Sequence, residues 1–395
     1  MSGRRALIAG GGLGGLTAAV ALHQRGWRVC VFEQAPTLEP VGAGISLWPN
    51  ALRALDVIGV GQRARAQATL SGRSGVRTPD GTWLSQADLG AAVGKRFGDP
   101  LVLMHRADLA AMLVEQLPFG TVRAGTPVLG VHIGADTVPA TLISQHEETE
   151  ADLVVAADGI RSVLRGFLYP QHPGPSYAGY TAWRMVVPAP EQIETGFESW
   201  GPAGRRFAVL PLAGQRLYCY ATVTARPGVR FDDERAELQR LFGDWHEPIP
   251  QIIAALQPGE LLHSDVEELA TPLPGFDRGR VALLGDAAHA LTPDLGQGGG
   301  LAIEDAVVLA DLLGDDEPVI EALHEYTRQR LPRTTAVARR SRRAGRLNSA
   351  PYGVQLLAAR LLGRLPPGAT VRGLTSTVDW HPPTPRLPRG SEGEG

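Results

Sequence analysis

Four short apolar runs lie on either side of the middle part of the sequence, and helical stretches follow some of them. Residues 6–9, 29–32, 153–156 and 281–284 each consist of consecutive apolar side chains. Runs of this length are typical of strands that are buried on both faces of a parallel sheet. A helical stretch follows the first run, and the spacing of apolar residues predicts an amphipathic helix over 301–313. The pattern therefore predicts an α/β unit.

The middle of the chain has a different pattern. Residues 177–187, 205–212 and 216–223 alternate polar or aromatic side chains with apolar ones. This period of two is typical of a sheet with two different faces. Two helices and a returning strand are expected within residues 232–271, and short alternating pieces near 70–100 predict a hairpin-like excursion. We therefore expect a second, sheet-based unit.

The first strand–helix–strand unit carries a dinucleotide-binding fingerprint. Gly10, Gly12 and Gly15 have the spacing G-x-G-x-x-G directly after the first strand, and Glu33 ends the second strand. The first glycine permits a tight turn, the second lets the backbone approach a pyrophosphate, and the third allows close helix–strand packing. An acidic residue after the second strand is placed to bind a ribose diol. This unit predicts dinucleotide binding.

Two further strands end in a carboxylate beside a glycine. Asp158-Gly159 follows one apolar run, and Gly285-Asp286 follows the last. Open α/β sheets bind ligands at the carboxyl ends of their strands. Pro293 and a glycine-rich turn then lead into a helix, whose free backbone amides form a site for negative charge. We expect the acidic strand end and this helix start to hold a flavin cofactor between them.

These patterns predict an α/β fold of mixed α+β character, with a Rossmann-like FAD-binding domain interleaved with a β-sheet substrate domain. A helical, arginine-rich segment follows, and the Pro-, Gly- and Glu-rich end of the chain is expected to be a disordered tail. The predicted assignment is 1–70, 100–173 and 272–335 for the FAD-binding domain, 71–99 and 174–271 for the substrate domain, 336–380 for the C-terminal helices, and 381–395 for the tail.

Composition narrows the class of partner. The 395 residues carry a net charge of −3, which gives no reason to expect nucleic acid or an anionic membrane as partner. The chain contains neither a signal-peptide pattern nor a long apolar run, so we expect a cytoplasmic protein without a membrane span. Cys30 and Cys219 belong to no CxxC pair, and no metal site is expected. Lys95 is the only lysine, which argues against Schiff-base chemistry and a P-loop.

Three motifs stand together in this order: Gly10-x-Gly12-x-x-Gly15, Asp158-Gly159-x-x-Ser162-x-x-Arg165, and Gly285-Asp286 followed by Pro293 and Gly296-x-Gly298. With them the chain resembles the single-component FAD-dependent aromatic hydroxylases, the group A flavoprotein monooxygenases related to para-hydroxybenzoate hydroxylase. The resemblance extends to about residue 345. Within this family the chain is most similar to the branch that contains urate and salicylate hydroxylases.

The resemblance implies roles for individual residues. Glu33 would bind the adenosine ribose, Arg106 the phosphate or ribityl region, and Asp286 the ribityl and pyrophosphate side of FAD; a surface ion pair is the alternative for Arg106. Asp158 would serve both FAD and NAD(P)H. The full set of expected cofactor contacts is Gly10, Gly12, Leu13, Gly15, Glu33, Gly44, Arg106, Asp158, Asp286, Pro293, Gly296, Gly298 and Gly299.

The substrate site is implied in the same way. Arg206, Tyr218 and Asp294 stand at the positions of an Arg, a Tyr and an Asp that line the substrate site of urate hydroxylases, and they are the candidate catalytic residues. Arg184 is a further substrate candidate and departs from the urate pattern. Packing within the sheet is the alternative for Arg206 and Tyr218. His289 is interpreted as structural.

The implied reaction is hydroxylation of a small or polycyclic aromatic or heteroaromatic substrate. FAD would be reduced by NADH or NADPH and would react with O₂ to give a flavin C4a-hydroperoxide, with the protein supplying orientation and charge stabilisation. Flavin-dependent epoxidation, decarboxylating hydroxylation and N-oxygenation are alternatives, and a catalytically inactive flavin-binding protein is the non-enzymatic one. Neither the substrate nor the choice between NADH and NADPH follows from the sequence. The protein is expected to be a monomer or a homodimer.

Overall fold

A six-stranded sheet lies at the centre of the computed structural model, in the order β17-β18-β11-β1-β2-β7. The structure describes residues 3–38, 43–68, 72–190, 193, 195–257, 259–314, 317–348 and 350–383. The four central strands are parallel and coincide with the predicted apolar runs: β1 (Arg5–Ala9), β2 (Arg28–Phe32), β11 (Leu153–Ala156) and β18 (Val281–Leu283). The edge strands are β7 (Val122–Arg123), which is parallel to β2, and β17 (Asp277–Arg278), which is antiparallel to β18.

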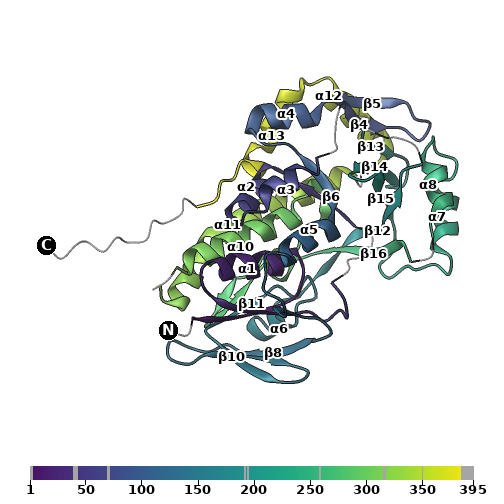
Figure 1. Cartoon of the computed structure of the whole chain (residues 1–395). Helices are drawn as coiled ribbons and strands as arrows, with labels where there is room; N and C mark the ends of the chain where they lie inside the picture. The colour runs from purple at the N-terminus through teal and green to yellow at the C-terminus, as the bar shows by residue number, and fades with distance from the viewer. Residues whose placement is uncertain are drawn as a thin grey trace.

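Both faces of this sheet are covered. Helices α1 (Leu13–Gln24), α10 (Gly298–Leu312) and α11 (Val319–Asn348) lie on one side (Figure 1). The side chains of α10 are buried almost along its whole length, because it packs between α1 and α11. The other side carries an antiparallel meander, formed by β8 (Val128–His132), β9 (Ala140–Ser144) and β10 (Glu148–Ala151). Burial on both faces explains the uninterrupted apolar runs of the strands.

A seven-stranded sheet forms the second layer, in the order β16-β12-β15-β14-β13-β4-β5. All neighbours in it are antiparallel except β13 and β4. One face packs on two helices and contributes Trp183, Phe207 and Cys219 to a core of its own. The strands are β4 (Ser74–Arg77), β5 (Trp83–Ala87), β12 (Ser176–Pro188), β13 (Phe197–Trp200), β14 (Arg206–Leu212), β15 (Arg216–Thr224) and β16 (Leu261–Glu268).

The remaining elements connect or cover these layers. Helix α11 runs without a break across residue 336, so the predicted start of the C-terminal helices falls inside it. Helices α12 (Tyr352–Gly363) and α13 (Pro367–Val378) return to the seven-stranded sheet, α12 against β5 and α13 against α4 (Leu89–Phe97). Of the predicted tail, only 381–383 lie within the described residues. The other elements are α2 (Pro49–Val57), α3 (Gly61–Arg65), α5 (Arg106–Val114), α6 (Val163–Leu168), α7 (Glu234–Phe242), α8 (Ile249–Ala255), α9 (Asp286–His289), the 3₁₀ turn Pro293–Leu295 and the pair β3 (Gly44–Leu47) and β6 (Val102–His105).

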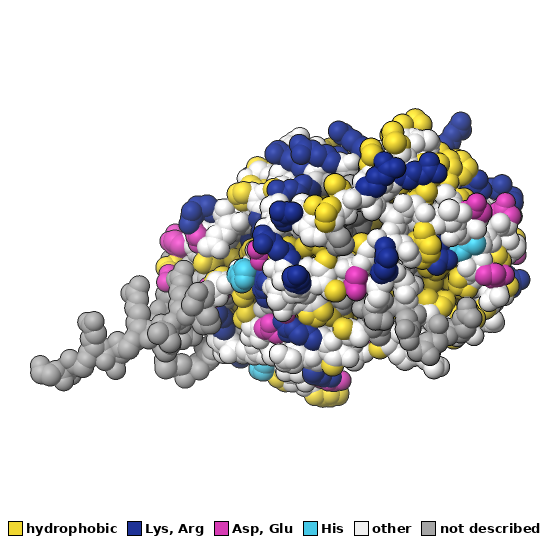
Figure 2. All heavy atoms as spheres, turned by 90° about the horizontal axis from the view of Figure 1, so that it is seen from above, with side chains coloured by type: hydrophobic (Ala, Val, Ile, Leu, Met, Phe, Trp, Pro, Cys, Tyr) yellow, Lys and Arg dark blue, Asp and Glu magenta, His cyan; other side chains and the backbone are white. Residues whose placement is uncertain are grey.

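The predicted α/β fold of mixed character, with a C-terminal helical segment, is confirmed. Two arginines at the arginine-rich end of α11 contact other parts of the protein. Arg342 lies 2.7 Å from Glu268, and Arg340 donates a hydrogen bond to the carbonyl of Ser376. Figure 2, which is seen from above relative to Figure 1, shows Arg and Lys side chains scattered among apolar and uncharged groups. Within the described ranges, no helix is both long and apolar enough to cross a membrane. In the same ranges, no group of three His, Cys, Asp or Glu side chains is arranged to hold a metal ion.

A buried ionic network joins α10 to α11. Arg330 is 1% exposed, and its guanidinium lies 2.6 Å from Asp305 and 2.8 Å from Glu304, both of which are fully buried. His289 Nε2 lies 2.5 Å from the second oxygen of Asp305. Burial would raise the pKa of Asp305, but the His289 and Arg330 charges outweigh burial and lower it to about 2. The carboxylate therefore stays ionised inside the protein.

Removing the cation from this network is expected to be costly. Arg330→Gln removes the cation that Asp305 and Glu304 share, and leaves Asp305 only His289 and Glu304 only Arg333 as charged partners. This should reduce the free energy of unfolding by about 3–5 kcal/mol. Arg328→Gln is the matched control, because it lies on the same helix but breaks a solvent-exposed pair with Glu325, which contributes little to stability. Denaturant unfolding of both variants measures the difference, and equal stabilities would contradict this role of Arg330.

Candidate functional site

A long cavity of about 1140 Å³ lies between the two sheets. One half, called the cofactor half, is lined at the carboxyl ends of β1, β2, β11 and β18, where open α/β sheets bind ligands. The other half, called the substrate half, is lined by the inner face of the seven-stranded sheet. The expected contacts that line the cofactor half and its junction with the substrate half are Gly10, Gly12, Leu13, Glu33, Gly44, Arg106, Asp158, Asp286, Pro293, Gly296, Gly298 and Gly299.

Two glycines of the fingerprint are required by the fold itself. Gly10 has φ +103°, and a Cβ there would lie 2.3 Å from the carbonyl oxygen of Ala157. A Cβ at Gly15 would lie 2.0 Å from the carbonyl oxygen of Gly10, so α1 packs tightly on β1 at this point. Gly15 is absent from the cavity wall, and its role in this structure is helix–strand packing.

At two other glycines, no contact within the protein excludes a side chain. Gly12 precedes α1 with an ordinary φ of −72°, and the nearest atom to a Cβ there would be Arg106 Nη2 at 3.5 Å. Gly298 begins α10, and a Cβ there would lie 3.9 Å from Asp286 Oδ1. Both side chains would enter the cavity at a helix start, where backbone amides favour negative charge. Bare helix starts facing one cavity fit the pyrophosphate and the ring system of FAD.

Glu33 supports the fingerprint turn as well as lining the cavity. Its Oε2 accepts a hydrogen bond from the amide of Gly11 at 2.7 Å, and its Oε1 accepts one from the amide of Ala35 at 2.8 Å. A carboxylate has about four acceptor positions, so two remain for a ribose diol. The residues of this turn therefore fit the adenosine side of FAD.

The two acidic strand ends differ in their surroundings. Asp286 is exposed within an otherwise buried segment, and it makes no hydrogen bond to the described residues, so its carboxylate is available to a hydroxylated ligand. Asp158 accepts hydrogen bonds from the Ser162 hydroxyl at 2.6 Å and from the Leu164 amide at 3.1 Å. Burial raises its pKa. Asp158 thus orders the loop before α6, and Arg165 joins that loop to the Asp286 turn by donating to the carbonyl of Ala287.

The glycine-rich turn and β3 bring the two halves into contact. A Cβ at Gly299 would lie 2.6 Å from the Ile45 side chain, and one at Gly44 would lie 2.4 Å from the Tyr218 ring. Gly44 is thus a glycine because Tyr218 packs on it, which the sequence did not indicate. The strand β3 therefore lies between the glycine-rich turn and Tyr218.

Alternation along the strands places the substrate candidates. On β15, Tyr218 and Tyr220 face the cavity, while Leu217, Cys219 and Ala221 enter the core on the other face. The antiparallel register sets four side chains in one row across the sheet, namely Glu198, Ala208, Tyr220 and Arg184. All four line the substrate half. The small Ala208 leaves room between the larger members of the row.

Arg206 occupies the neighbouring row and faces Glu198. Its Nη1 lies 3.4 Å from Glu198 Oε1, and its guanidinium lies over the Trp200 ring at 4.8 Å. Nη2 is buried and has no hydrogen-bond partner among the described residues. A buried donor without a partner is costly. Arg206 therefore lines the cavity and carries one donor that no described residue uses.

Two tyrosines that sequence reasoning missed bind the acidic residues of this half. Tyr220 donates to Glu198 Oε1 at 3.0 Å, and Tyr180 donates to Asp294 Oδ2 at 3.2 Å. Burial and the facing carboxylate raise the pKa of each tyrosine, so both hydroxyls keep their protons. Glu198 was also missed, because the short strand β13 escaped prediction. Its only sequence signal is a charged residue in a short segment that begins and ends with an aromatic residue, Phe197 and Trp200.

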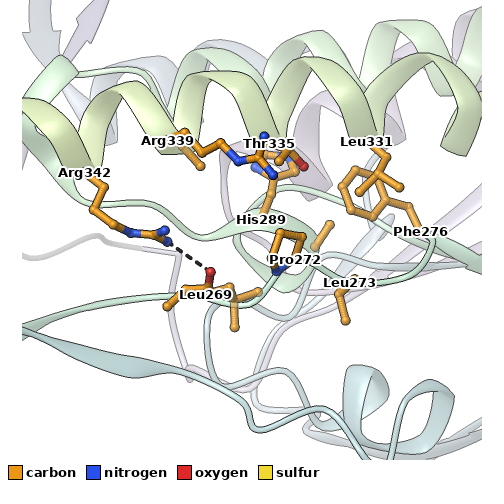
Figure 3. Close-up of a pocket in the computed structure, with 12 residues that line it drawn as sticks. Leu269, Pro272, Leu273, Phe276, His289, Leu331, Thr335, Arg339 and Arg342 are labelled. Carbon is orange, nitrogen blue, oxygen red and sulfur yellow. Dashed lines mark hydrogen bonds between the residues drawn. The ribbon is translucent and has the colours of Figure 1, made fainter.

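His289 lies away from the long cavity. It borders a separate cavity of about 260 Å³ beneath α11, together with Leu269, Pro272, Phe276 and Leu331 (Figure 3). Its ring packs on Phe276 at 5.7 Å, and its Nε2 is bound to the buried Asp305. These contacts agree with the structural interpretation of His289.

The chain is similar to known proteins in both sequence and fold. Residues 4–341 match the family model for the FAD binding domain. The chain is 38% identical over 349 residues to the aurachin C monooxygenase/isomerase of Stigmatella aurantiaca, covering 88% of this chain and 90% of that protein. It is 35% identical over 357 residues to the 3-amino-4-hydroxybenzoate 2-monooxygenase of Streptomyces cremeus, covering 86% of each. The crystal structure of Klebsiella pneumoniae HpxO complexed with FAD and uric acid superposes with a TM-score of 0.88 at 30% identity, covering 96% of this chain and 97% of that one.

Proposed function

Since the chain belongs to the FAD binding domain family and is an FAD-dependent monooxygenase of aromatic or heteroaromatic rings, we propose that its substrate ring binds between Arg206, Tyr218 and Asp294. The family resemblance inferred from the three motifs is confirmed. The observation that carries the proposal is the continuity of one cavity from the bare helix starts at Gly12 and Gly298 to the unused donor of Arg206. In this arrangement, the flavin ring and the substrate ring bind in the same cavity.

The cofactor half has a defined task in this proposal. Gly12 and Arg106 would hold the pyrophosphate, Glu33 the adenosine ribose and Asp286 the ribityl hydroxyls. The start of α10 at Gly298 would stabilise negative charge on the flavin ring. Once bound, FAD supplies the activation of O₂ after reduction by NADH or NADPH.

The substrate half orients the ring and keeps water away. Arg206 would donate to an acceptor on the substrate through Nη2, and Tyr218 would place the ring against β3. The core on the far face of the sheet makes these strands rigid, so the donors stay in position. Apolar side chains from three further elements extend the cavity, which leaves space for an apolar substituent: Leu89, Leu101, Leu103 and Leu374.

A substrate screen tests this function. The FAD-loaded protein is expected to oxidise NADH or NADPH faster when one class of aromatic compound is added, with O₂ uptake and a product that is heavier by one oxygen atom. The panel should contain purines, quinolones, phenols and hydroxybenzoates, since relatives act on uric acid and on an aminohydroxybenzoate. Absence of stimulation by every class would contradict the proposal, while a yellow protein would still show that FAD is bound.

A further inference from the structure

The substrate half contains a carboxylate with no assigned role, Glu198. It lines the cavity, and its side chain is 20% exposed. Three protein donors reach it: Tyr220 at 3.0 Å, Arg206 at 3.4 Å and the Trp200 indole at 2.7 Å. Because a carboxylate offers about four acceptor positions, one position remains for a ligand.

Glu198 also changes the charge that a substrate meets. Among the described residues, the charged side chains lining this half are Arg184, Arg206, Glu198 and Asp294, two cations and two anions. Arg206 would otherwise be a strong site for an aromatic carboxylate, since guanidinium and carboxylate form forked pairs. With Glu198 already at 3.4 Å, a second carboxylate at Arg206 would face a like charge. The pair therefore favours a ligand edge without a negative group.

The two partners offer complementary hydrogen bonds to such an edge. Arg206 Nη2 is a buried donor without a partner among the described residues, and Glu198 retains an acceptor position next to it. A carbonyl oxygen beside an N–H or O–H would satisfy both groups at once. This pattern is found in lactams, 2-pyridones, 2-quinolones and ortho-hydroxyaryl ketones, and it is absent from a benzoate.

We propose that Glu198 determines specificity, and that with Arg206 it selects a ring edge with adjacent carbonyl and N–H or O–H groups and rejects aromatic carboxylates. This inference rests on the proposed function, because it assigns the substrate class of the same site. The Ala208 position between Glu198 and Tyr220 supplies the space for that edge. Among the compounds named for the relatives, uric acid carries lactam groups and fits this edge, whereas the aminohydroxybenzoate carries a carboxylate and does not.

The test compares probes that differ in charge but hardly in size. 4-Hydroxyquinoline-2-carboxamide and 4-hydroxyquinoline-2-carboxylate are titrated into the FAD-loaded protein, and binding is followed by the change in flavin absorbance without NAD(P)H. The wild-type protein is expected to bind the carboxamide at least about tenfold more tightly than the carboxylate. Glu198→Gln should reduce this ratio by about tenfold or reverse it, because Arg206 then lacks a counter-charge.

Glu237→Gln is the matched control, since it removes the same charge from a helix on the other face of the sheet, where Glu237 pairs with Arg240. Its ratio should equal that of the wild type. Tighter binding of the carboxylate by the wild type, or an unchanged ratio in Glu198→Gln, would overturn the inference. If neither probe binds, each aromatic compound that stimulates NAD(P)H oxidation is compared with its carboxylated form. Stimulation by the carboxylated forms would then overturn the inference. Failure of every aromatic compound to stimulate is the separate outcome that removes the proposed function.

Discussion

Gly12→Ala is expected to weaken FAD binding by about a hundredfold or more while the protein still folds. A methyl group at this position would stand at the start of α1, where the backbone must approach the pyrophosphate closely. The protein itself leaves room for it, because the nearest atom to the added Cβ is Arg106 Nη2 at 3.5 Å. The dissociation constant is measured by titrating apoprotein with FAD and following flavin fluorescence, and circular dichroism checks the fold.

Gly166→Ala provides the control for this substitution. Gly166 is an exposed helical glycine on α6, and a Cβ there would meet no described atom within 4 Å. Its FAD affinity should be that of the wild type. Gly298→Ala tests the second bare helix start in the same way and should also weaken binding. Wild-type affinity in both Gly12→Ala and Gly298→Ala would show that these glycines do not contact FAD.

The second large effect is expected on kcat/KM when Arg206 is replaced. Arg206→Ala should lower kcat/KM for the substrate found in the screen by about a hundredfold, since hydrogen bonds from a charged donor contribute about 1.5–3 kcal/mol. It also leaves Glu198 without its cation inside the cavity. The affinity for FAD should stay within about twofold of the wild type, because Arg206 lies in the substrate half. Steady-state NAD(P)H oxidation and a flavin titration give the two quantities.

The preceding residue is an unusually close control. Arg205 points to the opposite face, where it donates to the carbonyl of Leu241 and lies over the Trp245 ring. Arg205→Ala removes the same charge one position away and should leave kcat/KM near the wild-type value. Equal losses in the two variants would mean that Arg206 acts through the stability of the sheet and does not contact the substrate.

The sequence predicted most of the cofactor half because its signals are local. The G-x-G-x-x-G spacing, the carboxylates at strand ends and the glycines around the start of α10 each lie within one strand–turn–helix unit. Short-range geometry decides where such residues go, and the structure places all of them except Gly15 on one cavity wall. Even there, the reason for Gly44 was missed, since it depends on Tyr218 more than 170 positions away.

The substrate half could be predicted only in part because its neighbours are set by strand register. Glu198, Tyr220 and Arg184 share one row only through three separate antiparallel pairings. A shift of one residue in any pairing would send a different set to the cavity. The sequence resemblance located Arg206, Tyr218 and Asp294, but it gave no indication that Arg206 pairs with Glu198 and that Tyr180 donates to Asp294.

The last helix of the described residues, α13, contributes one side chain to the cavity wall. Leu374 of α13 lines the cavity, while Val371 and Val378 of the same helix join Val93 and Phe97 of α4 in a small apolar cluster separate from the two main cores. Exchanging the side chains of this helix would therefore reshape the space for a substituent without disturbing the glycines that we propose to contact FAD. A gene could diversify its substrate range by altering a short terminal segment alone, and directed evolution could begin there.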